Sequence, residues 1–126
     1  MFGNHRVFPT IPATDMARAK RWYEEKLGLK PASEIPAGAM YYLGGGTGFL
    51  LYPTQFAGQA PNTLMGIETD DVEGDVAALK SKGVVFLDYD TPDLKTVNSI
   101  ANFGDLKGAW FKDSEGNILS IANPPN

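Results

Sequence analysis

The stretch that decides the fold is Gly108-Ala-Trp-Phe-Lys-Asp-Ser-Glu-Gly-Asn-Ile-Leu-Ser-Ile121. Two short apolar runs flank the polar segment 113–117, whose Asp and Asn side chains favour turns and whose Gly116 can adopt a positive φ. This pattern predicts a β-hairpin with a loop of three to five residues. Because side chains alternate along a strand, Trp110 and Lys112 are expected on one face of the hairpin.

The length and amino-acid composition of the chain limit the classes of protein to which it can belong. The 126 residues are expected to form a single domain, 1–126, and 43% of them are apolar and 21% charged. The net charge is −4 and basic residues do not cluster, which argues against nucleic-acid binding. We find no signal-peptide pattern and no apolar run able to span a bilayer, so we expect a cytoplasmic protein without a membrane partner.

Two residue types that build catalytic and metal sites are scarce. Cysteine is absent, which excludes a disulfide framework, a thiolate nucleophile and a thiolate metal site. The single histidine, His5, cannot by itself build a multi-histidine zinc site.

The first half of the chain is predicted to contain one helix and four strands. Thr14 or Asp15 can cap the start of the helix, and Gly28 supplies the left-handed position that ends it. Proline and glycine signals separate the other segments, and the run 44–48 is predicted to be a flexible hairpin turn. The predicted strands are 6–13, 29–35, 39–43 and 47–52, followed by a connector at 53–62.

The second half repeats the same order. A strand at 63–69 precedes a helix that begins at Asp70, with Glu73 completing a capping-box-like start, and ends at Gly83. A strand at 84–89 and the final hairpin complete it. The polar segment 91–106 between them is interpreted as an active-site lid or a surface loop, with residues around 95–97 able to pair as a strand.

This order amounts to an internal repeat of strand–helix–three strands, at about 1–58 and 59–126. One copy could hardly bury both its helix and its sheet face, whereas two copies can enclose a shared core. Apolar residues at helical spacing predict the buried stripes of the two helices, which are Met16, Ala19, Tyr23 and Leu27, then Val72, Val76 and Leu79.

The repeated segments resemble the glyoxalase/bleomycin-resistance/dioxygenase superfamily, also called vicinal oxygen chelate proteins. The resemblance lies in Ile-Pro-Ala-Thr-Asp-Met and Trp-Tyr-Glu-Glu-Lys-Leu-Gly-Leu of the first copy. In the second copy it lies in Thr-Asp-Asp-Val, Leu-Lys-Ser-Lys-Gly-Val and the final hairpin. It implies an α+β fold of two βαβββ modules, each a strongly curved mixed sheet, that form a half-barrel around a cavity. It also implies a homodimer.

The resemblance identifies four positions where metal-using relatives place ligands, on the first and last strands of each module. The first-strand ligand, usually His, corresponds to Phe8 and Leu64. The last-strand ligand, usually Glu, corresponds to Ser120 and to Leu51, or to Tyr52 if the register shifts by one residue. Divalent metals need several nitrogen or oxygen donors near 2 Å, which Phe and Leu do not offer.

Two other side chains could supply donors. His5 lies three residues before Phe8, so strand parity points it to the opposite face. Glu68 shares the parity of Leu64 but lies four residues away, and we interpret it as a rim carboxylate or as the partner of Lys112. We therefore predict that the metal ligands have been lost, with no metal and no cofactor.

Parity and the resemblance together predict an apolar cavity with a few polar groups, which is the usual composition of a small-molecule pocket. Trp110 corresponds to an aromatic substrate contact in thiol-transferring antibiotic-resistance relatives, and its indole N–H needs a partner. The alternative is that these side chains pack the barrel shut. The predicted ligand-binding residues are Phe8, Thr10, Tyr42, Leu51, Leu64, Glu68, Trp110, Lys112 and Ser120.

The leading hypothesis is a metal-free protein that binds a small organic molecule between aromatic faces, as bleomycin-resistance relatives do. The anionic net charge favours a cationic or neutral ligand. The alternative within the same superfamily is a metal-dependent lyase, dioxygenase or thiol transferase with non-standard ligands. Two others stay open: a metal-free isomerase or hydrolase with Glu68 as base, and a structural or regulatory dimer without a ligand.

Overall fold

The computed structural model describes residues 1–124, which form two α-helices, one short 3-10 turn (η1) and ten strands. In chain order they are β1 (Thr10–Ala13), α1 (Met16–Leu27), β2 (Ser33–Ile35), β3 (Gly38–Tyr42), η1 (Gly44–Gly46), β4 (Gly48–Pro53), β5 (Thr63–Glu68), α2 (Val72–Ser81), β6 (Phe86–Leu87), β7 (Thr96–Val97), β8 (Ile100–Phe103), β9 (Leu106–Lys112) and β10 (Ile118–Ala122).

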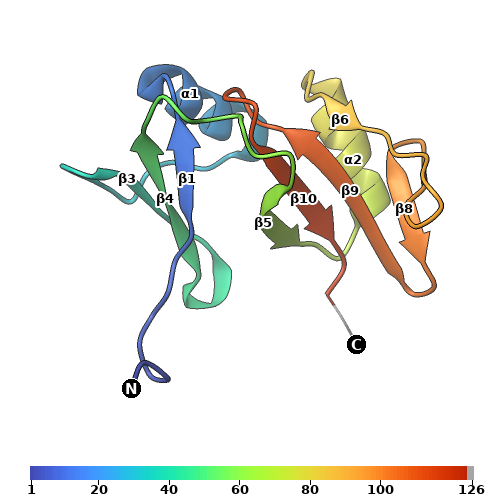
Figure 1. The fold of residues 1–126 in the computed structure, drawn as a ribbon, viewed down its shortest axis with the longest axis horizontal. Helices are drawn as coiled ribbons and strands as arrows, with labels where there is room; N and C mark the ends of the chain where they lie inside the picture. Colours follow the sequence, from blue (N-terminus) through green and yellow to red (C-terminus); the bar gives the residue numbers. More distant parts are fainter. Residues whose placement is uncertain (125–126) are drawn as a thin grey trace.

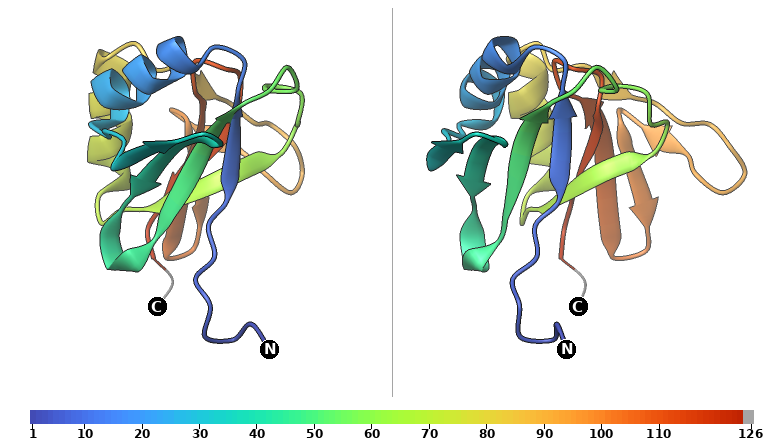
Figure 2. Two further views of the ribbon diagram at one scale, coloured as in Figure 1. Left: turned by 90° about the vertical axis from the view of Figure 1, so that its left-hand side faces the viewer. Right: turned by 60° about the vertical axis from the view of Figure 1, so that its left-hand side comes forward.

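The strands form two mixed sheets, one from each half of the chain. The four-stranded sheet has the order β1-β4-β3-β2, and the six-stranded sheet has the order β5-β10-β9-β8-β7, with β6 paired to β9. In each sheet the first strand runs parallel to the last strand of its half, β1 to β4 and β5 to β10. Figures 1 and 2 show the two sheets side by side with both helices on one side of them. This arrangement confirms the predicted α+β fold with curved sheets, and the described strands do not close into a barrel.

Both helices have the caps that their sequences favour, but the N-cap of α2 lies one residue later than predicted. The Asp15 carboxylate accepts a hydrogen bond from the backbone N–H of Arg18, and Gly28 ends α1 with φ 69°. The predicted start of α2 at Asp70 is wrong by one residue. Asp71 is the N-cap, because its carboxylate accepts the N–H of Gly74 while its own N–H donates to the hydroxyl of Thr69.

Several predicted segments have different bounds in the structure. The strand predicted at 29–35 contains only β2, Ser33–Ile35. The first strand begins at Thr10 instead of residue 6, because the pairing with β4 stops where the Leu50 N–H donates to the Pro9 carbonyl. The strand predicted at 84–89 contains only β6. Segment 91–106 includes the hairpin β7–β8, and pairing near 95–97 is confirmed. Asn98 and Ser99 form its turn with positive φ, a geometry the sequence did not signal because neither residue is glycine.

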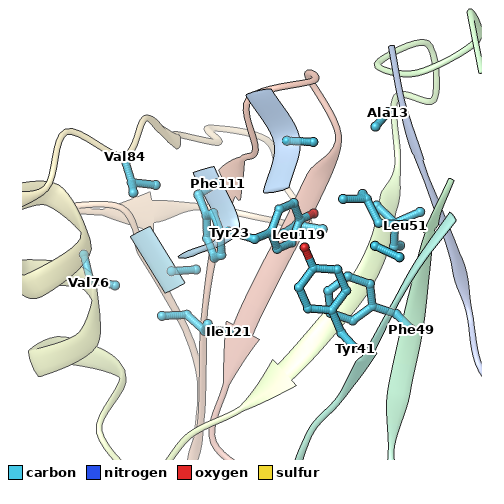
Figure 3. Packing of buried hydrophobic residues seen from close by; sticks show 14 of the residues in the cluster. Ala13, Tyr23, Tyr41, Phe49, Leu51, Val76, Val84, Phe111, Leu119 and Ile121 are labelled. Atoms are coloured by element: carbon cyan, nitrogen blue, oxygen red, sulfur yellow. The ribbon is translucent and has the colours of Figure 1, made fainter. Parts of the chain in front are cut away.

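A single apolar core joins the two halves. Tyr23 of α1 lies between them, with ring centroids 5.5 Å from Phe49 and 6.0 Å from Tyr41 of the first sheet. Phe111 and Leu119 of the second sheet reach the same cluster from the other side (Figure 3). Helix α1 thus packs against both sheets, and the predicted stripes of both helices face this core.

Candidate functional site

A buried polar cluster in the turn 113–117 fixes the final hairpin. One carboxylate oxygen of Asp113 accepts the N–H groups of Glu115 and Asn117, at 2.8 and 3.0 Å. The other accepts the Tyr23 hydroxyl at 2.7 Å and the Asn117 amide at 2.9 Å. The same amide also donates to the Pro12 carbonyl, 2.7 Å away. Burial and the neighbouring Asp113 carboxylate raise the pKa of Tyr23 far above its usual range, so this hydroxyl stays protonated.

Glu115 extends this contact to the start of α1. One of its carboxylate oxygens accepts the N–H groups of Thr14 and Asp15 at 2.9 Å each, and the other lies 2.8 Å from Arg18 Nε. Its side chain is fully buried. Burial opposes ionisation, but hydrogen bonds from Arg18, the Asp15 backbone and Ser114 lower the pKa of Glu115 to about 2. The second module therefore caps the helix of the first, and the cluster holds the two modules together.

A groove of about 660 Å³ lies between the two sheets. Its walls include Pro9 at the start of β1, Leu43 and Phe49 around the turn into β4, and four consecutive residues of β5, 65–68. Side chains on both faces of β5 border the groove, and β5 pairs only with β10 among the described strands. The groove therefore runs along the open edge of β5.

Glu68 is the one charged residue of this groove lining. No ion pair among the described residues includes it. The predicted pairing with Lys112 is wrong, because Glu68 lies opposite Ala122 of β10 whereas Lys112 lies opposite Ile118. Four residues along a strand separate the two by roughly 13 Å. The carboxylate is therefore available to a cationic group in the groove.

A smaller cavity of about 210 Å³ adjoins the groove. Phe8 and Tyr42, both predicted to bind a ligand, line it together with Arg6. The Arg6 guanidinium lies 5.5 Å from the centre of the Tyr42 ring and donates to the Gly46 carbonyl at 2.9 Å. Gly48 lines both cavities, so the two lie next to each other.

Trp110 and Ser120 lie opposite each other on β9 and β10, so their side chains share one face of the sheet. The Ser120 hydroxyl oxygen is 3.1 Å from the point where a Cβ on Gly66 would lie, so Ser120 is a neighbour of Gly66, which lines the groove. Tyr89 packs edge-on against the Trp110 ring, with centroids 5.4 Å apart. Tyr89, the last residue of the strand predicted at 84–89, was not predicted to contact Trp110, because nothing local in the sequence links the two residues.

The other predicted residues are dispersed. Thr10 is exposed on β1, and Lys112 is exposed at the end of β9. Leu64 is half-buried near the bulge where the register between β5 and β10 shifts. Leu51 is fully buried in the core beside α1, because it pairs with Ile11 on the core face of the first sheet. Its neighbour Tyr52 corresponds to the ligand position of metal-using relatives if the register shifts by one residue. The Tyr52 side chain points to the opposite face of the strand.

Several groove residues were not predicted. Met65, Ile67, Leu43 and residues of the glycine run 44–48 line it, yet this run was predicted only as a turn. A glycine within a strand, such as Gly66, often marks the close approach of another group, and this was the signal available.

The residues at the family's ligand positions do not fit a divalent metal. Phe8 and Leu64 carry no donor, and Ser120 offers one hydroxyl that lies against Gly66. Within residues 1–124, no group of three or more His, Cys, Asp or Glu side chains could hold a metal ion. Neither helix of this part of the chain is long and apolar enough to cross a membrane.

Comparison with known proteins identifies the class. Residues 5–121 match the model of the Glyoxalase/Bleomycin resistance protein/Dioxygenase superfamily. The chain belongs to this superfamily, as the two repeated modules indicated. No curated protein matches its sequence.

Solved structures share the fold at low identity. UcmS2 is 18% identical with a TM-score of 0.72, and the match covers 96% of this chain and 99% of that one. TnmS3, an antibiotic binding protein from Streptomyces sp. CB03234, is 24% identical with a TM-score of 0.63 and 99% of each chain covered. A variant of the fosfomycin resistance protein FosX from Listeria monocytogenes, complexed with Mn(II) and 1S,2S-dihydroxypropylphosphonic acid, is 10% identical with a TM-score of 0.68, covering 97% and 91%.

Proposed function

We propose that this protein binds a small, mainly apolar organic molecule in the groove between its two sheets, without a metal. The groove itself carries this proposal. Its volume of about 660 Å³ falls within the range of small-molecule pockets, and apolar side chains and glycines dominate its walls. The glycines leave backbone exposed to flat ligands, and Phe49 supplies an aromatic surface.

The charge of the groove favours a ligand with a cationic group. Glu68 has no cationic partner among the described residues, and its exposed side chain borders a largely apolar lining, so it can attract a cationic group at the mouth of the groove. TnmS3, which shares the fold, is an antibiotic binding protein, and this supports a ligand-binding role for the same scaffold here.

Titration with three planar aromatic probes of different charge tests the proposal. Proflavine is cationic, acridone is neutral and anthraquinone-2-sulfonate is anionic. We expect saturable binding in the order cation, neutral, anion. Glu68→Gln is expected to weaken proflavine binding roughly tenfold, about 1.4 kcal/mol, and to leave acridone unchanged. Glu34→Gln on the distant strand β2 is the control. The proposal is wrong if none of the probes saturates and a wider antibiotic screen gives no thermal shift.

The competing function is a metal-dependent lyase, dioxygenase or thiol transferase with non-standard ligands. The FosX structure, which shares the fold, is a complex with Mn(II), and this supports a metal-dependent function as the second candidate. Elemental analysis of protein purified without chelator separates the two functions. One equivalent of Mn, Fe, Ni or Zn per chain, lost in Glu68→Gln, would favour the metal enzyme.

We also propose that the protein is a cytoplasmic homodimer. The superfamily membership supports the dimer. Light scattering during gel filtration gives the mass in solution and tests it independently of any ligand.

A further inference from the structure

The smaller cavity, of about 210 Å³, contains one charged group, the Arg6 guanidinium. Its other walls come from the segment before β1, from Met40 and Tyr42 of β3, and from the turn that leads into β4. Within residues 1–124, no ion pair includes Arg6, and its guanidinium has one hydrogen-bond acceptor, the Gly46 carbonyl. Because an arginine side chain carries five N–H donors, most of them are left for a ligand.

Two contacts fix the orientation of this guanidinium. It lies over the Tyr42 ring, 5.5 Å from the ring centre, and its Nη2 donates to the Gly46 carbonyl at 2.9 Å. A side chain that is already ordered in this way loses little conformational entropy when it binds a ligand. The planar fork of its remaining N–H groups matches the two oxygens of a carboxylate. With Phe8 and Met40 in the walls, the cavity suits a carboxylate that is carried on an apolar group.

The turn between β3 and β4 separates the smaller cavity from the groove. Gly44 and Gly45 line the groove, Gly46 lines the smaller cavity, and Gly48 lines both. A Cβ added at Gly44, Gly45 or Gly46 would meet no atom within 4 Å apart from the residues next to it in the chain. The backbone of the turn is therefore open at these glycines, and a ligand in the groove can extend across it to Arg6.

The two neighbouring cavities carry opposite charges. Glu68 is the one charged residue in the lining of the groove, and Arg6 is the one charged residue in the lining of the smaller cavity. No ion pair among the described residues joins the two side chains. The fold therefore holds a cation and a carboxylate apart, and each can bind a ligand group of the opposite charge.

We propose that the ligand is amphoteric, with a cationic group at Glu68 and an anionic group, such as a carboxylate, at Arg6 in the smaller cavity. This inference rests on the proposed function, because the groove holds the flat apolar body that joins the two charged groups. An anion that lacks the cationic group gains only the contact with Arg6, and Glu68 repels it when its ring enters the groove.

Two probes that differ in a single charge test the proposal. Tetramethylrhodamine is a zwitterion with a carboxylate, and its methyl ester is a cation with the same flat ring system. By fluorescence anisotropy at neutral pH, we expect the wild type to bind the zwitterion roughly tenfold more tightly than the ester. Arg6→Gln is expected to make the two affinities equal, whereas Glu68→Gln weakens both probes by the same factor. Arg21→Gln is the control, because it removes the same charge from an exposed position of α1, and we expect it to keep the preference.

NMR spectroscopy measures the anion site on its own. The arginines of the chain are Arg6, Arg18 and Arg21, so their Nε–H signals are easily told apart with one variant of each. Benzoate carries a carboxylate and no cation. We expect it to shift the Arg6 signal saturably and to leave the signals of Arg18, which pairs with Glu115, and of the exposed Arg21.

The outcomes separate this inference from the proposed function. Equal binding of the two rhodamines by the wild type, a preference that survives Arg6→Gln, or an Arg6 signal that moves no more than that of Arg21 overturns the amphoteric ligand. The groove still stands as the ligand site in those cases, provided that Glu68→Gln weakens the cationic ester. Failure of both rhodamines to saturate overturns the amphoteric ligand together with the groove, whatever benzoate does.

Discussion

Glu115 offers the most direct test of how the two modules are joined. Its buried carboxylate accepts backbone N–H groups at the start of α1 and pairs with Arg18. The pKa of Glu115 falls from 4.5 to about 2 in the folded protein. A difference of roughly 2.5 pKa units corresponds to about 3 kcal/mol of folding free energy at pH 7. We expect Glu115→Gln to lower stability by that amount and the melting temperature by roughly 10 °C.

The pH dependence identifies the cause of this loss. Because the folded pKa is depressed, the stabilisation is complete above about pH 4.5 and is lost as the pH falls toward 2. Glutamine does not titrate, so the gap between the wild type and Glu115→Gln narrows on acidification. The same two pKa values leave a contribution of about 1.4 kcal/mol at pH 3.

Urea unfolding of both proteins at pH 7, 5, 4 and 3 measures this gap. Glu24→Gln is the control on the same helix, because Glu24 is exposed and, within residues 1–124, forms its one ion pair with Lys30. We expect it to change stability far less at every pH. The reasoning is refuted if the Glu115→Gln gap is below about 1 kcal/mol at pH 7 or does not change with pH.

Four other substitutions test the core and the groove. Tyr23→Phe removes a buried hydroxyl that donates to a carboxylate, and we expect it to lower the free energy of unfolding by about 1–3 kcal/mol. Tyr41→Phe removes the one buried side-chain hydroxyl without a partner in residues 1–124. We expect this change to be neutral or stabilising in the same unfolding assay. Leu51→Ala is expected to cost about 2–5 kcal/mol in thermal unfolding without changing the relative affinities of the three probes, because the side chain lies in the core. Gly66→Val extends a branched side chain into the groove, and we expect it to abolish probe binding. Circular dichroism is expected to show unchanged secondary structure. Tight binding of the probes to this variant would place the ligand elsewhere.

Local signals in the sequence were sufficient for most of the elements. Alternation and the turn residues around Gly116 predicted the β9–β10 hairpin, and helical spacing predicted the stripe that includes Tyr23. These features depend on residues close together in the chain, where side-chain period and capping act directly. The β7–β8 turn at Asn98 and Ser99 was not predicted, because both residues have positive φ and neither is a glycine.

The candidate site was less predictable. Parity and the resemblance predicted that Trp110 and Ser120 face the same way, and they lie opposite each other on neighbouring strands. Leu51, by contrast, was expected in the cavity and is buried in the core. A strand alternates its faces at every residue, so an error of one in the register reverses the inference. The position of Glu68, four residues along β10 from Lys112, likewise followed only from the strand pairing.

By itself, the sequence determined the repeated strand–helix–strand order, the superfamily, and the apolar residues at positions where metal-using relatives carry ligands. Those properties follow from local periodicity and from which residues occupy given positions. Only the tertiary structure showed that an open edge of β5 borders the groove and that a buried Glu115 in one module caps the helix of the other. Both depend on contacts between residues far apart in the chain, up to about a hundred positions for Glu115 and Asp15, and packing of the whole chain brings such residues together.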